Sequence, residues 1–202
     1  MNAHFRETRV RDVFLQAGGL MHTSQAVQAG IHPRDLYALR DAGILEAVSR
    51  GVYRLSDLPP LADPDFVTVA TRVPKAVIAV VSALYFHGLT TEIPHEVSIA
   101  LPKGTARPKL YWPPLRVYWL SGVMFTTEIE SHECDGVIVR VYGAAKAVAD
   151  SFKFRNRLGI ELAVEALRTG LEGRQFTPAE LLCVARTCRV DRIVRPYLEA
   201  LQ

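Results

Sequence analysis

The chain is poor in cysteine, and its few cysteines form no framework pattern. Cys134, Cys183 and Cys188 are the only three among 202 residues, and no two of them have the CxxC spacing of a zinc ribbon. Because disulfide-built domains carry a larger and usually even set of cysteines, we expect reduced thiols and a cytoplasmic location.

Long apolar runs are also missing. Residues 1–9 contain no apolar stretch of the kind that a secretory signal peptide needs. The longest apolar run, residues 76–84, is much shorter than the roughly 20 residues that a membrane-spanning helix requires. We therefore expect no membrane association.

The sequence has no recognisable catalytic or metal-binding motif. The six histidines are scattered and form no HExxH pair. There is no GxGxxG, P-loop or GxSxG segment, and a nuclease-like site would need an acid two residues before Lys103, where Leu101 stands. The sequence thus predicts no enzyme, no cofactor and no metal.

An excess of one charge is nearly absent too. Lysine and arginine total 24 against 21 acids, and the net charge is +3, which permits nucleic-acid binding without demanding it. What the chain does have is apolar content: hydrophobic residues make up 49% of it, enough for a sizeable core.

Residues 1–58 carry the pattern of a winged helix-turn-helix, which begins with two helices. Val10, Val13, Phe14 and Ala17 recur at the spacing of one helix face. We expect Gly18-Gly19 to end that first helix. A short second helix is expected to begin at Thr23 as its N-cap and to close at Gly30.

The third helix is the predicted recognition helix, begun by Pro33 and ended by Gly43. Short strands over 45–48 and 52–55, joined through 49–51, are expected to form the wing. Helix-turn-helix proteins read base edges with the N-terminal part of the third helix. The residues expected to contact DNA are Thr23, Ser24, Gln25, Arg34, Tyr37, Ala38, Arg50 and Arg54.

Each of these contacts has a chemical reason. With Leu36 and Leu39 in the core, a rotation of about 100° per residue turns Arg34 and Tyr37 outward. The Arg34 fork matches guanine O6 and N7, whereas the wing arginines suit the DNA backbone or minor groove. The start of the second helix suits phosphates.

A purely protein-binding winged helix remains an alternative. Residues 1–58 hold seven basic and six acidic residues, whereas strong DNA binders cluster their cations. Asp35 and Asp41 would repel phosphate unless Arg34 or Arg40 pairs with them. We expect Arg40 to lie towards the core in a structural ion pair.

The proline-rich stretch 56–64 indicates a boundary, so residues 59–202 form a second, α+β domain with a C-terminal helical bundle. Helices are predicted over 66–72 and 82–87, and 76–81 is either a buried strand or a helix start. Strands are predicted over 97–101, 116–120, 125–129 and 137–142. The last third is helical, with a capping box at Thr177–Glu180. Cys183 and Cys188 are expected in the helical core.

One stretch of this domain, residues 103–119, interleaves cations with aromatic rings and contains no acid. A second cationic stripe, at Lys146, Lys153 and Arg157, is expected on one helix face. The rings either pack the core beneath solvated cations or form a surface for a partner or nucleic acid. The predicted surface comprises Lys103, Arg107, Lys109, Trp112, Lys146, Lys153 and Arg157.

Three segments together resemble the AbiEi family, the antitoxins of type IV toxin–antitoxin systems. They are Val48–Leu55 (VSRGVYRL), Ser82–Thr91 (SALYFHGLTT) and Val139–Asp150 (VRVYGAAKAVAD), the last continued by Phe152–Arg155 (FKFR). The resemblance extends over nearly the whole chain. It implies a winged helix that represses its own operon by binding operator DNA, and a C-terminal domain that counters a nucleotidyltransferase-like toxin in phage defence by abortive infection.

Another reading is a stand-alone winged-helix regulator whose C-terminal domain senses a ligand or a protein. A third is an interaction or nuclease-like module, against which the missing acid before Lys103 speaks. The operator, the toxin and the way in which the toxin is neutralised stay open at this point, as does a homodimer on DNA.

Overall fold

A computed structural model of the chain describes residues 3–58 and 63–201. The chain divides into two compact units, residues 1–74 with 133–139 and residues 75–132 with 140–202. The predicted domain boundary after residue 58 is next to residues 59–62, which lie outside the described residues, so this boundary stays a prediction.

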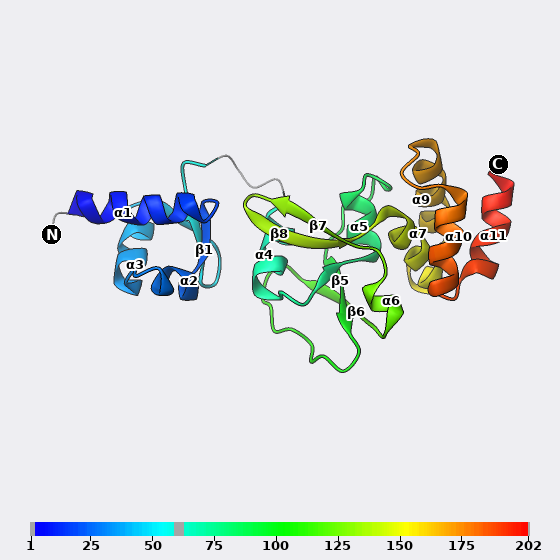
Figure 1. The fold of residues 1–202 in the computed structure, drawn as a ribbon, viewed down its shortest axis with the longest axis horizontal. Coiled ribbons are helices and arrows are strands. Elements are labelled where there is room, and N and C mark those ends of the chain that lie inside the picture. The colour runs from blue at the N-terminus through cyan, green and yellow to red at the C-terminus, as the bar shows by residue number, and fades with distance from the viewer. Residues whose placement is uncertain (1–2, 59–62, 202) are drawn as a thin grey trace. The chain divides into compact units, whose positions relative to one another are not determined.

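The N-terminal part is a winged helix-turn-helix, as predicted (Figure 1). Its elements are α1 (Ala3–Gln16), β1 (Leu20–His22), α2 (Thr23–Gln28), α3 (Pro33–Asp41), β2 (Leu45–Ser49) and β3 (Val52–Leu55). The three strands form an antiparallel sheet in the order β1-β3-β2. The pattern did not predict β1, because three residues are too few to show alternation.

One apolar cluster holds these helices and strands together. The predicted inner face of α1 is confirmed: Phe14 is fully buried and Val10 nearly so, while Val13 and Ala17 pack against the same cluster. The cluster comprises Val10, Phe14, Met21, Ala26, Ile31, Leu36, Leu45, Tyr53 and Leu55. Burial of a large apolar side chain stabilises by about 1.5–3 kcal/mol, so these contacts fix how α3 is oriented.

Glycines end the two helices of the helix-turn-helix, as predicted. Gly30 and Gly43 have φ values of 80° and 74°, a region that glycine enters without a steric cost. Directly after them, the amides of Ile31 and Ile44 return to carbonyls of α2 and α3 at 2.9 Å. This is the Schellman arrangement, and it ends each helix within one residue.

We call residues 63–201 the C-terminal part, although residues 63–74 and 133–139 belong to the first compact unit. This part is α+β, as predicted (Figure 1). Its first half contains α4 (Pro64–Arg72), β4 (Val77–Ile78), α5 (Val80–Phe86), β5 (Val97–Pro102), β6 (Leu115–Leu120), α6 (Val123–Thr126), β7 (Ile129–Cys134) and β8 (Val137–Tyr142). The second half is helical: α7 (Ala144–Lys153), α8 (Arg155–Leu158), α9 (Ile160–Glu172), α10 (Pro178–Thr187) and α11 (Asp191–Ala200).

The five strands form one mixed sheet in the order β6-β5-β4-β8-β7. β5 runs antiparallel to β4 and parallel to β6, and β4 runs parallel to β8. Residues 76–81, for which both readings were open, contain both a short strand and the start of a helix. The predicted strand over 125–129 is wrong, because a helical turn fills 123–126 and β7 begins only at Ile129.

The C-terminal helices follow the predicted pattern with one exception. The capping box is present, with Thr177 accepting from the Glu180 amide and Glu180 accepting from the Thr177 amide. Cys188 is buried, but Cys183 is exposed, so the expectation that both lie in the core is wrong for Cys183. Burial, together with the nearby Asp150 carboxylate, raises the pKa of Cys188 to about 11.

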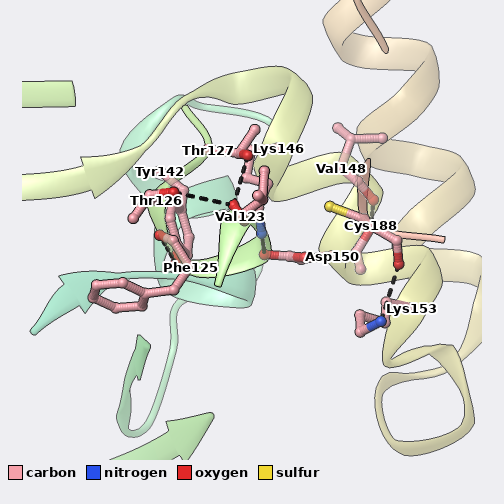
Figure 2. Close-up of polar contacts among 11 residues, drawn as sticks. Val123, Phe125, Thr126, Thr127, Tyr142, Lys146, Val148, Asp150, Lys153 and Cys188 are labelled. Carbon is pink, nitrogen blue, oxygen red and sulfur yellow. Dashed lines mark hydrogen bonds and ion pairs between the residues drawn. The ribbon is translucent and has the colours of Figure 1, made fainter. Parts of the chain in front are cut away.

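α7 is the central helix of this bundle and contains a buried ion pair. It contacts α5, α9, α10 and α11, and nine of its residues are buried. The Lys146 ammonium donates to the Asp150 carboxylate one turn later (Figure 2). It also lies 4.2 Å from the centre of the Tyr142 ring, and the Tyr142 hydroxyl donates to the Phe125 carbonyl at 2.7 Å.

The prediction that Lys146 belongs to a cationic surface is therefore wrong, since its side chain is 0% exposed. Ala147, Val148 and Phe152 of α7 are fully buried too, so this helix has apolar neighbours on nearly every side. Burial raises the pKa of Asp150, and the facing Lys146 opposes that rise. The cation is retained in the core because its counter-ion is there with it.

This arrangement predicts opposite effects for breaking and for replacing the pair. Lys146→Met leaves a buried carboxylate without its cation and should destabilise the protein by about 3–5 kcal/mol, whereas Lys146→Met with Asp150→Leu should be close to neutral or stabilising. Urea unfolding measures both free energies. Arg116→Gln, which breaks the exposed pair with Glu96, is the control and should change stability by less than about 1 kcal/mol. If Lys146→Met lowers the free energy of unfolding no more than this control does, the assignment is contradicted.

Candidate nucleic-acid interface

The recognition helix α3 has one buried face and one polar face, and the buried face determines the direction in which the polar face points. Leu36 is fully buried and Leu39 packs on the same cluster. Arg34 and Ala38 are exposed, and 47% of Tyr37 is exposed. The predicted orientation of α3 is therefore present, with Arg34 one position after the first helical residue.

His32 fastens the start of this helix. Its Nδ1 accepts a hydrogen bond from the Arg34 amide at 3.2 Å, and Pro33 occupies the first helical position. Because proline has no amide hydrogen and a fixed φ, it fits the first turn without loss. His32 and Pro33 therefore set where Arg34 leaves the backbone.

The far end of the exposed face is occupied by an internal contact. Arg40 donates to the Asp41 carboxylate at 2.7 Å, and its guanidinium lies 5.4 Å from the centre of the Tyr37 ring. The predicted ion pair of Arg40 is present, but its side chain is 42% exposed, so its predicted position towards the core is wrong. The pair neutralises the carboxylate that would otherwise face phosphate.

The start of α2 differs from the prediction. His22, not Thr23, is the N-cap: its Nδ1 accepts from the Ser24 amide at 3.2 Å, and its own amide donates to Gln25 Oε1 at 2.8 Å. Thr23 is already the first helical residue. The prediction of Thr23 as cap is wrong because the imidazole acts as the acceptor that a hydroxyl or carboxylate usually provides.

Thr23 instead fastens α2 to the tip of the wing. Its amide and its hydroxyl both donate to the Gly51 carbonyl, at 2.8 and 3.1 Å. Gly51 has a φ of 76°, which lets the turn after Arg50 close tightly. Ser24 and Gln25, at the first turn of α2, therefore lie close to the wing turn that carries Arg50.

The two wing arginines have different surroundings. Arg50 is exposed at the turn, where it can reach a phosphate. Arg54 is 6% exposed and donates to Glu46 on the neighbouring strand at 2.6 Å, with which it is in register. The prediction of Arg54 as a DNA contact is wrong, because its side chain is buried and held in a structural pair with Glu46.

The predicted surface of the C-terminal part is only partly assembled. Lys103, Arg107, Lys109 and Trp112 are exposed on the connection between β5 and β6. The predicted stripe on one helix does not exist, because Arg157 lies on α8 rather than α7, Lys146 is buried, and Lys153 donates to the Cys188 carbonyl at 3.0 Å.

The described residues offer no sign of a metal centre or a membrane span. In residues 3–58 and 63–201, no three side chains among His, Cys, Asp and Glu are grouped so that they could hold a metal ion. In the same residues, no helix combines the length and the apolar content needed to cross a bilayer.

The N-terminal part also matches a known family. Residues 9–56 match the family model described as a transcriptional regulator, AbiEi antitoxin. This part of the chain carries an AbiEi-type regulator domain. The match begins in α1 and ends just after β3. It confirms the resemblance over residues 9–56, and the resemblance of the two later segments stays a prediction. No curated protein matches the chain.

The sequence pattern did not predict the N-caps His22 and His32, since histidine is an uncommon N-cap. The cap of α3 can be tested by substitution. His32→Ala removes the acceptor of the Arg34 amide and should lower the free energy of unfolding by about 1 kcal/mol, whereas His32→Asn supplies another acceptor and should keep it. Urea unfolding compares the two variants. Equal losses for alanine and asparagine would mean that the ring, and not the cap, is what matters.

Proposed function

We propose that this protein is an antitoxin and autorepressor that binds operator DNA through its AbiEi-type domain. The observation that carries the proposal is the outward face of α3, where Arg34 and Tyr37 are exposed while Leu36 holds the opposite face in the core. A major groove admits a helix of this size. The family description, an antitoxin that regulates transcription, supports the same conclusion.

In this proposal α3 reads bases and its neighbours fix the docking. Arg34 reaches a guanine with two parallel hydrogen bonds, and Tyr37 and Ala38 contact a phosphate or a thymine methyl group. Arg50 contacts the backbone beside the wing, and Ser24 and Gln25 approach a phosphate at the start of α2. Thr23 takes part only through its bonds to Gly51.

The charge of this domain sets how DNA binding depends on salt. Residues 1–58 hold seven basic and six acidic residues, and the contact surface includes only two cations free of ion pairs within the described residues, Arg34 and Arg50. Because each neutralised phosphate adds about 0.9 to the slope of log K against log salt, one domain alone gives a shallow slope. Two copies on a two-fold operator would double the number of phosphate contacts, and we propose that the protein binds in this way.

The second half of the proposal is that the C-terminal part counters a nucleotidyltransferase-like toxin without enzymatic activity of its own. This part has its own core around α7, and none of the residues proposed to contact DNA belongs to it. It would act in the cytoplasm, where the operator and the toxin are both found.

DNA reading is tested by separating base contacts from phosphate contacts. Arg34→Ala should cost about 1–3 kcal/mol on the operator and relax specificity at one base pair, and Arg50→Ala should weaken all sequences alike and reduce the salt slope by about 1. Gel shifts on the upstream DNA, at several salt concentrations, measure both. Arg11→Gln is the matched control, because Arg11 is paired with Asp57. Equal losses on operator and random DNA for Arg34→Ala would refute the base contact.

The antitoxin role is tested by growth. We expect the gene next to that of this protein to encode the toxin and to arrest growth when expressed alone. The full chain, expressed with it from a constitutive promoter, should restore growth. The Arg34→Ala, Arg50→Ala double variant should rescue equally well, because neutralisation uses the other part of the chain. If the double variant fails to rescue growth, the division between a DNA-binding part and a neutralising part is contradicted. If the neighbouring gene is not toxic, a stand-alone regulator is favoured.

A further inference from the structure

The connection between β5 and β6, together with β6 itself, carries aromatic rings that the core does not use. Tyr111 is 101% exposed, Trp112 63% and Trp119 43%. Exposed tryptophan and tyrosine side chains so close in sequence are unusual on a surface without a ligand. We call residues 103–112 together with Trp119 the basic-aromatic loop.

Cations accompany these rings. Lys103, Arg107 and Lys109 are exposed, and residues 103–119 contain no acid. Arg116 nearby is already paired with Glu96 at 2.5 Å. Among residues 3–58 and 63–201, none of the three loop cations takes part in an ion pair. The loop therefore carries three positive charges that no described side chain neutralises.

Hydrogen bonds brace the loop at its base. The indole of Trp119 donates to the Thr105 carbonyl at 2.9 Å, and Arg107 donates to the Leu115 carbonyl at 3.2 Å. The Lys103 amide donates to the Leu120 carbonyl at 2.8 Å. Because both ends are fastened to the paired strands β5 and β6, the base of the loop is held in place before binding, which lowers the cost of ordering the loop backbone.

The combination of these features distinguishes between kinds of partner. Protein interfaces are rich in aromatic residues but poor in lysine, and two of the three loop cations are lysines. A duplex keeps its bases stacked inside and offers no face to a protruding ring. A single strand offers both base faces for stacking and a charged backbone for cations.

We propose that the basic-aromatic loop binds single-stranded nucleic acid, with bases stacked on Trp112 and Tyr111 and the backbone held by Lys103, Arg107 and Lys109. This goes beyond the proposed operator binding, which uses a duplex and a different part of the chain. It does not depend on that function.

The chain contains its own reporter for this site. Trp112 and Trp119 are its only tryptophans, so the tryptophan fluorescence, excited selectively over the tyrosines, comes entirely from this loop. The full chain is titrated with oligo(dT) and oligo(rU) of twelve nucleotides and, separately, with a duplex of the same length and unrelated sequence. We expect both single strands to quench the emission and the duplex to leave it nearly unchanged at the same concentration.

Variants separate stacking from charge, with affinity measured by the anisotropy of a labelled oligonucleotide. Trp112→Ala should weaken binding by about 10-fold or more, in keeping with the loss of one stacked base. Lys109→Gln should reduce the slope of log K against log salt by about 0.7. Arg192→Gln, at an exposed cation of α11, is the matched control and should change neither value.

The outcomes decide between partners. Absence of quenching by either oligonucleotide, equal binding of the duplex, or unchanged affinity in both loop variants would overturn the proposal. Emission that responds to the purified toxin and not to a single strand would make the loop a protein surface instead. Arg34→Ala should leave single-strand binding intact, so failure of operator reading and failure of this proposal are seen separately.

Discussion

The complete burial of Leu36 determines what the recognition helix can present. A helix advances by about 100° per residue, so once Leu36 is set into the cluster with Phe14, Leu45 and Leu55, the directions of Arg34 and Tyr37 follow. The wing contributes two of those partners from β2 and β3, so the hairpin holds the helix as well as carrying Arg50. A cavity at this position would loosen both the helix and the wing.

The ends of α2 and α3 further restrict the positions of these helices. His22 and His32 each accept a backbone amide through Nδ1, and Gly30 and Gly43 close the same helices with positive φ. Thr23 then joins the first turn of α2 to the wing tip through Gly51. These local bonds place the residues of the proposed DNA contact on one framework with little freedom.

The two proposed binding surfaces differ in how they use charge. The proposed DNA reader has few cations, and in the proposal it uses shape and one arginine fork, whereas the basic-aromatic loop combines exposed rings with three cations that no described side chain neutralises. Another cation of the C-terminal part, Lys146, has a structural role instead, because it neutralises Asp150 inside the bundle. Charge alone therefore does not identify a binding residue; its exposure and its partners do.

Local sequence determined the helices and turns of the N-terminal part. Val10 and Phe14 recur at helical spacing, as do Leu36 and Leu39, and Gly30 and Gly43 adopt a backbone conformation that few other residues tolerate. It also determined most strands and the Thr177 capping box, whose bonds span three residues. Tertiary structure alone decided which cations are free. Arg54 and Lys146 were predicted to be at a binding surface, but they are buried and paired with Glu46 and Asp150. Burial and pairing depend on packing against other elements, and the spacing of residues along one element does not contain that information.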